Sequence, residues 1–429
     1  MKRLIVPLTD PAAVAAGRFG PKAANQAALG QAGLPIPGGF CLDAEAYRLQ
    51  IASLGLTESA HLAGTLERLQ GRRHVSAVRI ALFEEPITPA VLDPLLSAWR
   101  KLVDTTGALT VVRSSALMED KAGSSFAGQF ETFLGLDSET DFLTAVRACW
   151  AALWSSRALQ YMESHGVSPA DTAMALLVQP LVDAQASGGG LSRTADGGML
   201  LSATWGLGEA IAQGEVVPDR YELSAEGELR ETTAGVKTHS VRCVHHHGAS
   251  SPQAVAKDLV SEPCLDQARV VELARMLKKA EDVLGVPAEI EWAIDDTGFK
   301  MLQARPLHME PAQVPDEIWL RHPGLKGHPA GIGWGSGRAC VINCECELSR
   351  VAPGDVLVTK VAGPALSQVL PRVAGVVAEL GGSTSHLASL ARERGIPMVL
   401  GVLEATHRIP DGGQVAVDGV AGVVRWIHP

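Results

Sequence analysis

A proline-bearing stretch near residue 310 divides the chain and limits what it can fold into. Residues from Leu307 to Pro329 hold four prolines, mixed charges and little hydrophobic periodicity. Because proline fixes φ and lacks an amide donor, such a stretch favours a semi-rigid linker over a helix or an interior strand. We therefore predict a first domain over residues 1–308, a linker over residues 309–330 and a second domain over residues 331–429.

The first domain alternates helical and strand-like segments, which indicates an α/β or α+β core. An alanine-rich stretch from Lys22 to Gln31 predicts a helix that ends near Gly33. Short apolar runs predict buried strands at residues 109–112, 175–178 and 199–203. The predicted fold class is therefore a multidomain α/β and α+β protein.

Large apolar residues recur at helical spacing between residues 142 and 154. They are Phe142, Leu143, Val146, Trp150, Leu153 and Trp154. We interpret them as the core-facing side of a helix, with a functional aromatic stripe as the alternative. The second domain has a different pattern of short strands, glycine-rich turns and one or two helices. Its length of about 100 residues is enough for one compact domain.

Charge, hydropathy and cysteine content narrow the functional classes. The chain has 429 residues and a formal net charge of −10, which weighs against general nucleic-acid binding. No apolar run approaches the roughly 20 residues of a membrane span, and the first apolar stretch stops at Asp10, too early for a signal peptide. The seven cysteines are odd in number and unevenly spread, which predicts reduced thiols. We expect a cytoplasmic protein without nucleic-acid or membrane partners.

The segment from Gly381 to Pro397 predicts a short helix whose start can bind an anion. One of the three hydroxyl residues at 383–385 can cap the helix, and Gly395 can end it. His386 then lies in the first turn, where backbone amides and the helix dipole favour negative charge. A histidine that is largely neutral near pH 7 is a competent nucleophile toward phosphorus. The alternative is a capped helix with a surface histidine.

Residues 289–304 predict a β-hairpin with one polar and one apolar face. Two strand-like stretches, 289–294 and 299–304, flank a three-residue turn in which Gly298 suits the left-handed position. The predicted register pairs Glu291 with Gln303, and Glu289 with Arg305. The opposite face then holds Ile290, Trp292, Ile294, Leu302 and Ala304. Oxygen ligands of this kind suit Mg²⁺ and arginine suits phosphate, whereas the alternative is a surface hairpin with a Glu–Arg pair.

Two clusters contain residue types that can bind metal, but their spacing does not match a known metal-binding motif. Cys340, Cys344 and Cys346 lie close together, but not at the spacing of a paired zinc knuckle. The tract His245–His247 adjoins Cys243 without a second paired motif. A metal site is an alternative for either cluster.

The segment around His386 resembles the phosphohistidine signature of the PEP-utilising enzymes, which include pyruvate-phosphate dikinase, PEP synthase and rifamycin phosphotransferase. The similarity extends to Pro353–Val358 and Gly375–Glu379. The resemblance implies that His386 carries phosphate on a small swivelling domain.

The first domain resembles the nucleotide-binding domain of the same family, which has the ATP-grasp fold with two lobes. The similar segments are Gly20–Asn25, with Pro21 and Ala23 in place of glycines, then Val112–Ala116, Ser125–Gln129, Trp205–Ala210, Gly214–Val216 and Pro218–Asp219. The resemblance implies nucleotide binding by Lys22, Arg113, Ser125, Ala127, Gly128, Gln129, Gln179, Glu209 and Arg305, and metal binding by Glu291 and Gln303. Taken singly, Lys22 could be a surface lysine and Arg113 a salt-bridge partner.

The resemblance implies catalysis by His386, Arg113 and Lys22 with ATP and Mg²⁺ as cofactors. The β-phosphate of ATP would pass to His386 and then to an acceptor, with release of AMP and phosphate. No segment resembles the acceptor domains of larger family members, so we expect a small-molecule or protein-borne acceptor, with a partner subunit as one location of its site. Two alternatives stay open, a subunit of a split phosphotransferase and a non-catalytic ATP sensor. The retained histidine argues against the sensor, which needs no nucleophile.

Overall fold

The computed structural model describes residues 3–65, 68–119, 130, 132–164, 166–194, 196–243, 250–307, 319, 322 and 324–427. These residues form two compact units that each draw on separate parts of the chain. The first unit comprises Met1–Asp183, Cys243–Ser251 and Lys300–Arg305. The second comprises Ala184–Arg242, Pro252–Phe299 and Pro306–Pro429. The predicted mixed α/β multidomain architecture is confirmed.

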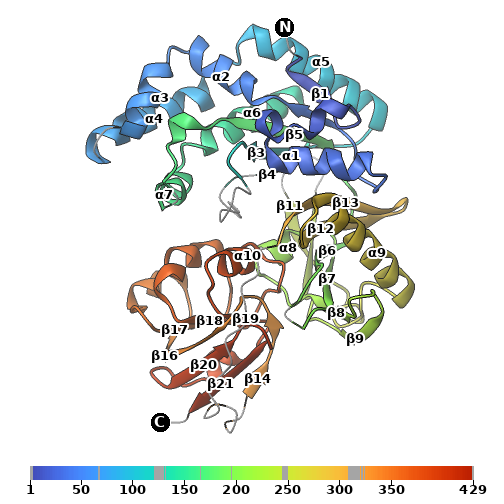
Figure 1. The fold of residues 1–429 in the computed structure, drawn as a ribbon, viewed down its shortest axis with the longest axis vertical. Coiled ribbons are helices and arrows are strands. Elements are labelled where there is room, and N and C mark those ends of the chain that lie inside the picture. Colours follow the sequence, from blue (N-terminus) through green and yellow to red (C-terminus); the bar gives the residue numbers. More distant parts are fainter. Residues whose placement is uncertain are drawn as a thin grey trace. The chain divides into compact units, whose positions relative to one another are not determined.

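A five-stranded antiparallel sheet forms the centre of the first unit, with helices packed around it (Figure 1). In spatial order its strands are β1 (Ile5–Pro7), β2 (Phe40–Leu42), β5 (Met174–Pro180), β3 (Thr110–Ala116) and β4 (Thr132–Leu136). The helices are α1 (Ala16–Gln31), α2 (Ala44–Ser53), α3 (Thr57–Thr65), α4 (Arg68–Glu84), α5 (Pro89–Thr106), α6 (Glu139–Ala152) and α7 (Ser156–Ser164). Strands β3 and β5 confirm two of the predicted apolar runs, and α1 ends two residues before Gly33, as predicted.

Helix α6 and the residues after it supply much of the core of the first unit. Phe142, Trp150 and Trp154 are almost fully buried, which confirms the interpretation of this stripe as core. The ring of Trp99 stacks on Phe142 at 5.1 Å between centroids, and the Trp154 indole donates a hydrogen bond to the Tyr47 hydroxyl at 2.9 Å. Because a buried indole N–H needs an acceptor, this bond fixes the orientation of Trp154.

The second unit begins with a six-stranded sheet covered on one face by helix α9 (Gln267–Leu284) (Figure 1). Its strands, in spatial order, are β13 (Gly298–Pro306), β12 (Ala288–Asp295), β6 (Ala186–Leu191), β7 (Met199–Trp205), β8 (Asp219–Leu223) and β9 (Leu229–Thr233). The short helix α8 (Glu209–Ala212) follows β7, and β10 (His239–Cys243) pairs with β11 (Ser250–Ala254). Strand β7 confirms the third predicted apolar run. Residues Lys300–Arg305 of β13 belong to the first unit.

An eight-stranded sheet makes up the C-terminal part of the second unit. In spatial order its strands are β14 (Gly324–Lys326), β21 (Val423–Ile427), β20 (Gln414–Asp418), β16 (Trp334–Ile342), β17 (Val356–Thr359), β18 (Gly375–Ala378), β19 (Met398–Leu400) and β15 (His328–Pro329). Strands β16 to β19 run parallel, and helix α10 (His386–Glu393) connects β18 to β19. Helix α11 (Ala405–Arg408) follows β19. Valines of the central strands form much of the core, and the short strands and helices of this region agree with the predicted pattern.

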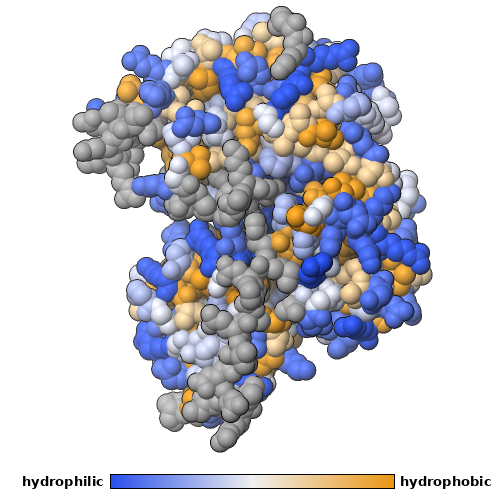
Figure 2. Space-filling model, in the orientation of Figure 1, coloured by the Kyte–Doolittle hydropathy of each residue, from blue (hydrophilic) through white to orange (hydrophobic). Residues whose placement is uncertain are grey.

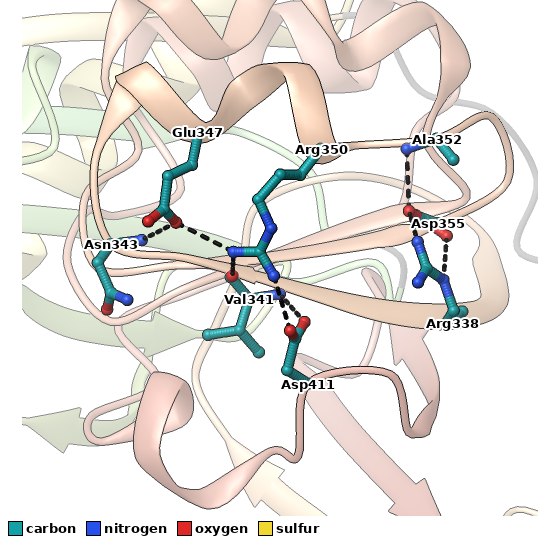
Figure 3. Close-up of polar contacts among 8 residues, drawn as sticks. All are labelled: Arg338, Val341, Asn343, Glu347, Arg350, Ala352, Asp355 and Asp411. Atoms are coloured by element: carbon teal, nitrogen blue, oxygen red, sulfur yellow. Dashed lines mark hydrogen bonds and ion pairs between the residues drawn. The ribbon is translucent and has the colours of Figure 1, made fainter.

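Two ion-pair groups fasten the loop between β16 and β17 (Figure 3). The carboxylate of Asp355 accepts two hydrogen bonds from the Arg338 guanidinium, at 3.1 and 2.9 Å, and one from the backbone amide of Ala352. Burial raises the pKa of Asp355, but the bonds from Arg338 and Ala352 outweigh it and hold that pKa below its usual value. Arg350 joins Asp411 at 2.7 Å. The Pro-Gly-Asp segment is therefore a structural turn.

The structure divides the chain differently from the predicted boundaries. Strands β14 and β15 lie within the predicted linker and pair with β21 and β19, so the C-terminal sheet begins at Gly324. Residues 308–318, 320, 321 and 323 of that linker lie outside the described part of the chain. Residues from Ala184 to Phe299, apart from the stretch around β11, group with the C-terminal sheet, because helix α10 contacts their strands directly.

The cysteines depart from expectation in one place. Cys344 and Cys346 are joined by a disulfide, so the prediction that all seven thiols are reduced is wrong, and these two residues are not available as zinc ligands. The tract His245–His247 lies outside the described residues. Among the described residues, no group of three or more His, Cys, Asp or Glu could hold a metal ion.

On the face drawn in Figure 2, hydrophilic residues predominate with hydrophobic ones between them. Within the described ranges, no helix combines the length and the apolar character that crossing a membrane requires.

Candidate phosphotransfer site

A glycine kink at the start of α1 brings this helix against the end of β3. Gly20 has a φ of 72°, and a Cβ atom added there would lie 2.4 Å from the carbonyl oxygen of Ser115. The helix resumes at Pro21, whose fixed φ suits a first helical position. The Ala23 amide then donates to the Ser115 hydroxyl at 3.1 Å. Only glycine fits this approach, which explains why one glycine of the motif is kept.

Lys22 follows this kink and is tied to the same strand end. Its ammonium donates to the carbonyl oxygen of Ser114 at 2.8 Å and lies 3.5 Å from a carboxylate oxygen of Glu119. The Lys22 side chain is only 16% exposed and that of Glu119 only 5%, so Lys22 is not a snorkelling surface lysine. The carboxylate of Glu119 and the carbonyl oxygen of Ser114 together hold the ammonium in place.

Arg113, in the middle of β3, fastens strand β13 to the first unit. Its guanidinium donates to the carbonyl oxygen of Leu302 at 2.5 Å and to the side-chain oxygen of Gln303 at 2.9 Å. Helix α1 adds two further bonds to β13, from Asn25 to Ala304 and from Gln26 to Met301. Segments far apart in sequence thus converge on β13.

Arg305 lies near the end of the same strand and is only 7% exposed. The first unit therefore contains the three predicted phosphate-contacting cations, with Lys22 on α1, Arg113 on β3 and Arg305 on β13. Such a group of fixed cations suits a polyanionic ligand, because guanidinium and ammonium groups are the side chains that bind phosphate.

The other predicted nucleotide residues fall into three groups. Gln179 is buried on β5, and its amide donates to the Gly38 carbonyl oxygen at 3.0 Å. Glu209 begins α8 in the second unit and is half-buried. The predicted phosphate loop lies outside the described residues, and with it Ser125, Ala127, Gly128 and Gln129.

The predicted hairpin of β12 and β13 is present. Gly298 has a φ of 105°, which confirms the left-handed glycine of the turn. Of the predicted apolar face, Ile290, Trp292, Ile294 and Ala304 are buried, but Leu302 is only half-buried, whereas its neighbour Met301 is fully buried. Glu291 is half-buried and lies opposite Gly189 of β6. The pairing of Glu291 with Gln303 stays a prediction.

Helix α10 begins at His386, as predicted. Ser385 caps it, with its hydroxyl accepting the Ala388 amide at 3.2 Å, and the helix ends at Glu393 before Gly395, whose φ is 65°. His386 is half-buried in the first turn. The helix start therefore has the geometry that favours an anion beside the imidazole.

The structure gives two carboxylates contacts that the sequence does not predict. Glu119 meets Lys22, and no pattern signals it. Glu289 was predicted on the polar face of the hairpin, but its carboxylate accepts bonds from Ser389 and Arg392 of α10.

Comparison with known families agrees with this arrangement. The family model described as pyruvate phosphate dikinase, AMP/ATP-binding domain, matches residues 16–320. The model of the PEP-utilising enzyme, mobile domain, matches residues 351–422. The chain belongs to the PEP-utilising dikinase family. This confirms the resemblance on which the site residues were chosen.

Curated relatives of this family member carry the name phosphoenolpyruvate synthase. A probable one from Methanothermobacter thermautotrophicus is 32% identical over 95% of this chain and 61% of that protein. The Pyrococcus furiosus protein is 30% identical over 94% of this chain and 56% of its own length, and the Escherichia coli protein 30% over 92% and 53%. The chain thus spans between about half and three fifths of the relatives it matches.

Proposed function

We propose that this dikinase-family chain transfers the β-phosphate of ATP to His386 and then to an acceptor, with AMP and phosphate as the other products. The observation that carries the proposal is the position of His386 in the first turn of a capped helix, behind the Gly381–Gly382 turn. Membership of a family with an AMP/ATP-binding domain supports ATP as the donor.

The cations of the first unit have an electrostatic role in this reaction. Phosphoryl transfer asks little covalent chemistry of a protein and depends on positioning and on stabilising charge. Lys22 and Arg113 are held by hydrogen bonds or ion pairs and Arg305 is buried, so these cations need little rearrangement when charge develops on the phosphates. We infer that they bind the phosphate chain.

The chemistry of two further side chains suits a magnesium ion. Glu291 offers a carboxylate, and the amide oxygen of Gln303 keeps one lone pair beyond the bond it accepts from Arg113. Hard oxygen donors of this kind, completed by phosphate oxygens and water, are what Mg²⁺ prefers. When bound, the ion would neutralise charge on the phosphate oxygens.

Charging of His386 takes place in two steps. A ring nitrogen of His386 forms a bond to the β-phosphorus while the bond from that phosphorus to the oxygen of AMP breaks. Water then removes the γ-phosphate as inorganic phosphate, which leaves one phosphate on the histidine. The name of the relatives supports pyruvate as the acceptor, with phosphoenolpyruvate as the product.

Position-labelled ATP tests the donor step. With Mg²⁺ and ATP labelled at the β-phosphate, we expect label on the protein, whereas label at the γ-phosphate should appear as inorganic phosphate. Label from the γ-phosphate on the protein, with ADP as the product, would mean an ordinary kinase. Tight ATP binding without any label on the protein would favour the sensor.

A further inference from the structure

The ammonium group of Lys22 has two acceptors, both in the first unit. Its nitrogen lies 2.8 Å from the carbonyl oxygen of Ser114 and 3.5 Å from a carboxylate oxygen of Glu119. An ammonium group has three N–H donors. Among the described residues, the third donor of Lys22 has no acceptor. One donor is therefore left for a ligand.

The carboxylate of Glu119 is buried beside this ammonium. The Glu119 side chain is only 5% exposed and that of Lys22 only 16%. Removing a carboxylate from water is costly unless a cation and hydrogen bonds compensate for the lost hydration. The proposed transfer assigns no step to Glu119, and a carboxylate repels phosphate. Its place beside a phosphate-binding lysine therefore needs a different explanation.

The backbone around Glu119 fixes its carboxylate. Glu119 ends a turn that directly follows β3, and its amide donates to the carbonyl oxygen of Ala116 at 3.1 Å. Earlier in this turn, the Leu117 amide donates to the carbonyl oxygen of Ala173 at 3.1 Å, and Met118 is buried. Because the turn is bonded and packed into the first unit, the carboxylate is held at one place near the end of β3.

The backbone of Lys22 is fixed by the same strand end. The amide of its neighbour Ala23 donates to the Ser115 hydroxyl at 3.1 Å. A lysine side chain, however, carries its charge on a flexible four-carbon stem, so a fixed backbone does not by itself fix the ammonium. The acceptors at the tip of the side chain, Ser114 and Glu119, orient the charge.

We propose that Glu119 is a positioning residue for Lys22, and that its carboxylate, with the Ser114 carbonyl oxygen, orients the ammonium for the phosphate chain before ATP binds. The advantage is entropic, because affinity falls when a ligand has to order a long side chain. A lysine that is already ordered in the free protein avoids this loss. The inference rests on the phosphate-binding role that we propose for Lys22.

Two substitutions of Glu119 separate the effect of position from that of charge. Glu119→Asp keeps the negative charge but shortens the side chain by one carbon, so the carboxylate withdraws from Lys22. Glu119→Gln loses the charge but keeps the length and an oxygen acceptor. The dissociation constants for ATP and for adenosine, which carries no phosphate, are measured by titration calorimetry on the full chain.

We expect Glu119→Asp to weaken ATP binding by about tenfold, the loss that corresponds to ordering one long side chain on binding. Glu119→Gln should bind ATP more tightly than Glu119→Asp. Adenosine should bind equally to all three proteins, whereas a distorted fold would weaken adenosine binding as well. In a Lys22→Met background, Glu119→Asp should cause no further loss of ATP affinity, because one residue acts through the other.

The results separate this inference from the proposed function. Wild-type ATP affinity in Glu119→Asp, weaker binding by Glu119→Gln than by Glu119→Asp, a parallel loss of adenosine affinity, or an equal further loss in the Lys22→Met background would each overturn the positioning role. A wild-type chain that binds ATP and depends on Glu119 as expected, yet takes no label on His386, would overturn the proposed transfer and leave the positioning role standing.

Discussion

Replacing Gly20 with alanine tests how the nucleotide cations are positioned. At a φ of 72° and a ψ of 159°, a region that essentially only glycine adopts, an alanine costs about 1–3 kcal/mol relative to glycine. The new Cβ would also lie 2.4 Å from the Ser115 carbonyl oxygen and from its hydroxyl oxygen. Relieving an overlap with backbone typically costs about 1–3 kcal/mol. The sum predicts a loss of about 2–6 kcal/mol in the free energy of unfolding.

The Gly20→Ala substitution should also weaken the binding of ATP. Ser115 accepts the Ala23 amide, and its neighbour Ser114 accepts the Lys22 ammonium, so a shift of this strand end displaces the cation. We expect weaker ATP binding by titration calorimetry alongside the loss of stability in urea unfolding.

Gly17→Ala is the matched control in the same helix. Nothing lies within 4 Å of a Cβ added at Gly17, so this change should be neutral or should stabilise by up to about 1 kcal/mol. If Gly20→Ala unfolds at the same urea concentration as Gly17→Ala, the close approach of α1 to β3 is not what fixes Lys22.

Two further predictions concern a buried histidine and the metal ligand. Burial, together with the nearby charge of Arg220, lowers the pKa of His328 from 6.5 to about 3. As pH drops below 6.5, the imidazole therefore takes up a proton in the unfolded chain but not in the folded one. Because the unfolded state binds more protons, the free energy of unfolding falls with pH in this range. Between pH 7 and pH 5, wild type should lose about 2 kcal/mol more than His328→Gln in urea unfolding, and parallel losses would contradict this. Glu291→Ala should raise the Mg²⁺ concentration for half-maximal charging while changing the free energy of unfolding by less than about 1 kcal/mol, with Glu231→Ala as the exposed-strand control. An unchanged magnesium requirement would remove Glu291 from the metal site.

Local sequence signals predicted the elements around the site. The cap before His386, the left-handed Gly298 and the aromatic stripe of α6 each depend on residues close together in the chain. Capping, turn geometry and helical periodicity depend on residues only a few positions apart, so they can be predicted from one sequence without an alignment. The confirmed predictions are of this kind, whereas the assignment of individual ligands still rests on the family.

Other features depend on contacts that local patterns do not record. Strand β15 contains Pro329, yet it pairs at the edge of a sheet, where the missing amide costs no ladder bond. Arg392 and Glu289 are 103 residues apart, and only the folded chain brings them together. The bond between Cys344 and Cys346 likewise cannot be read from the cysteine count.

The central claim is that His386 carries phosphate, and the intact mass of the protein tests it most directly. After incubation with Mg-ATP and without any acceptor, the wild-type chain should gain the mass of one phosphate, which acid removes and base does not. His386→Ala should bind ATP and gain no such mass. A phosphate that remains on the His386→Ala protein, or one that is stable to acid on wild type, would contradict the account.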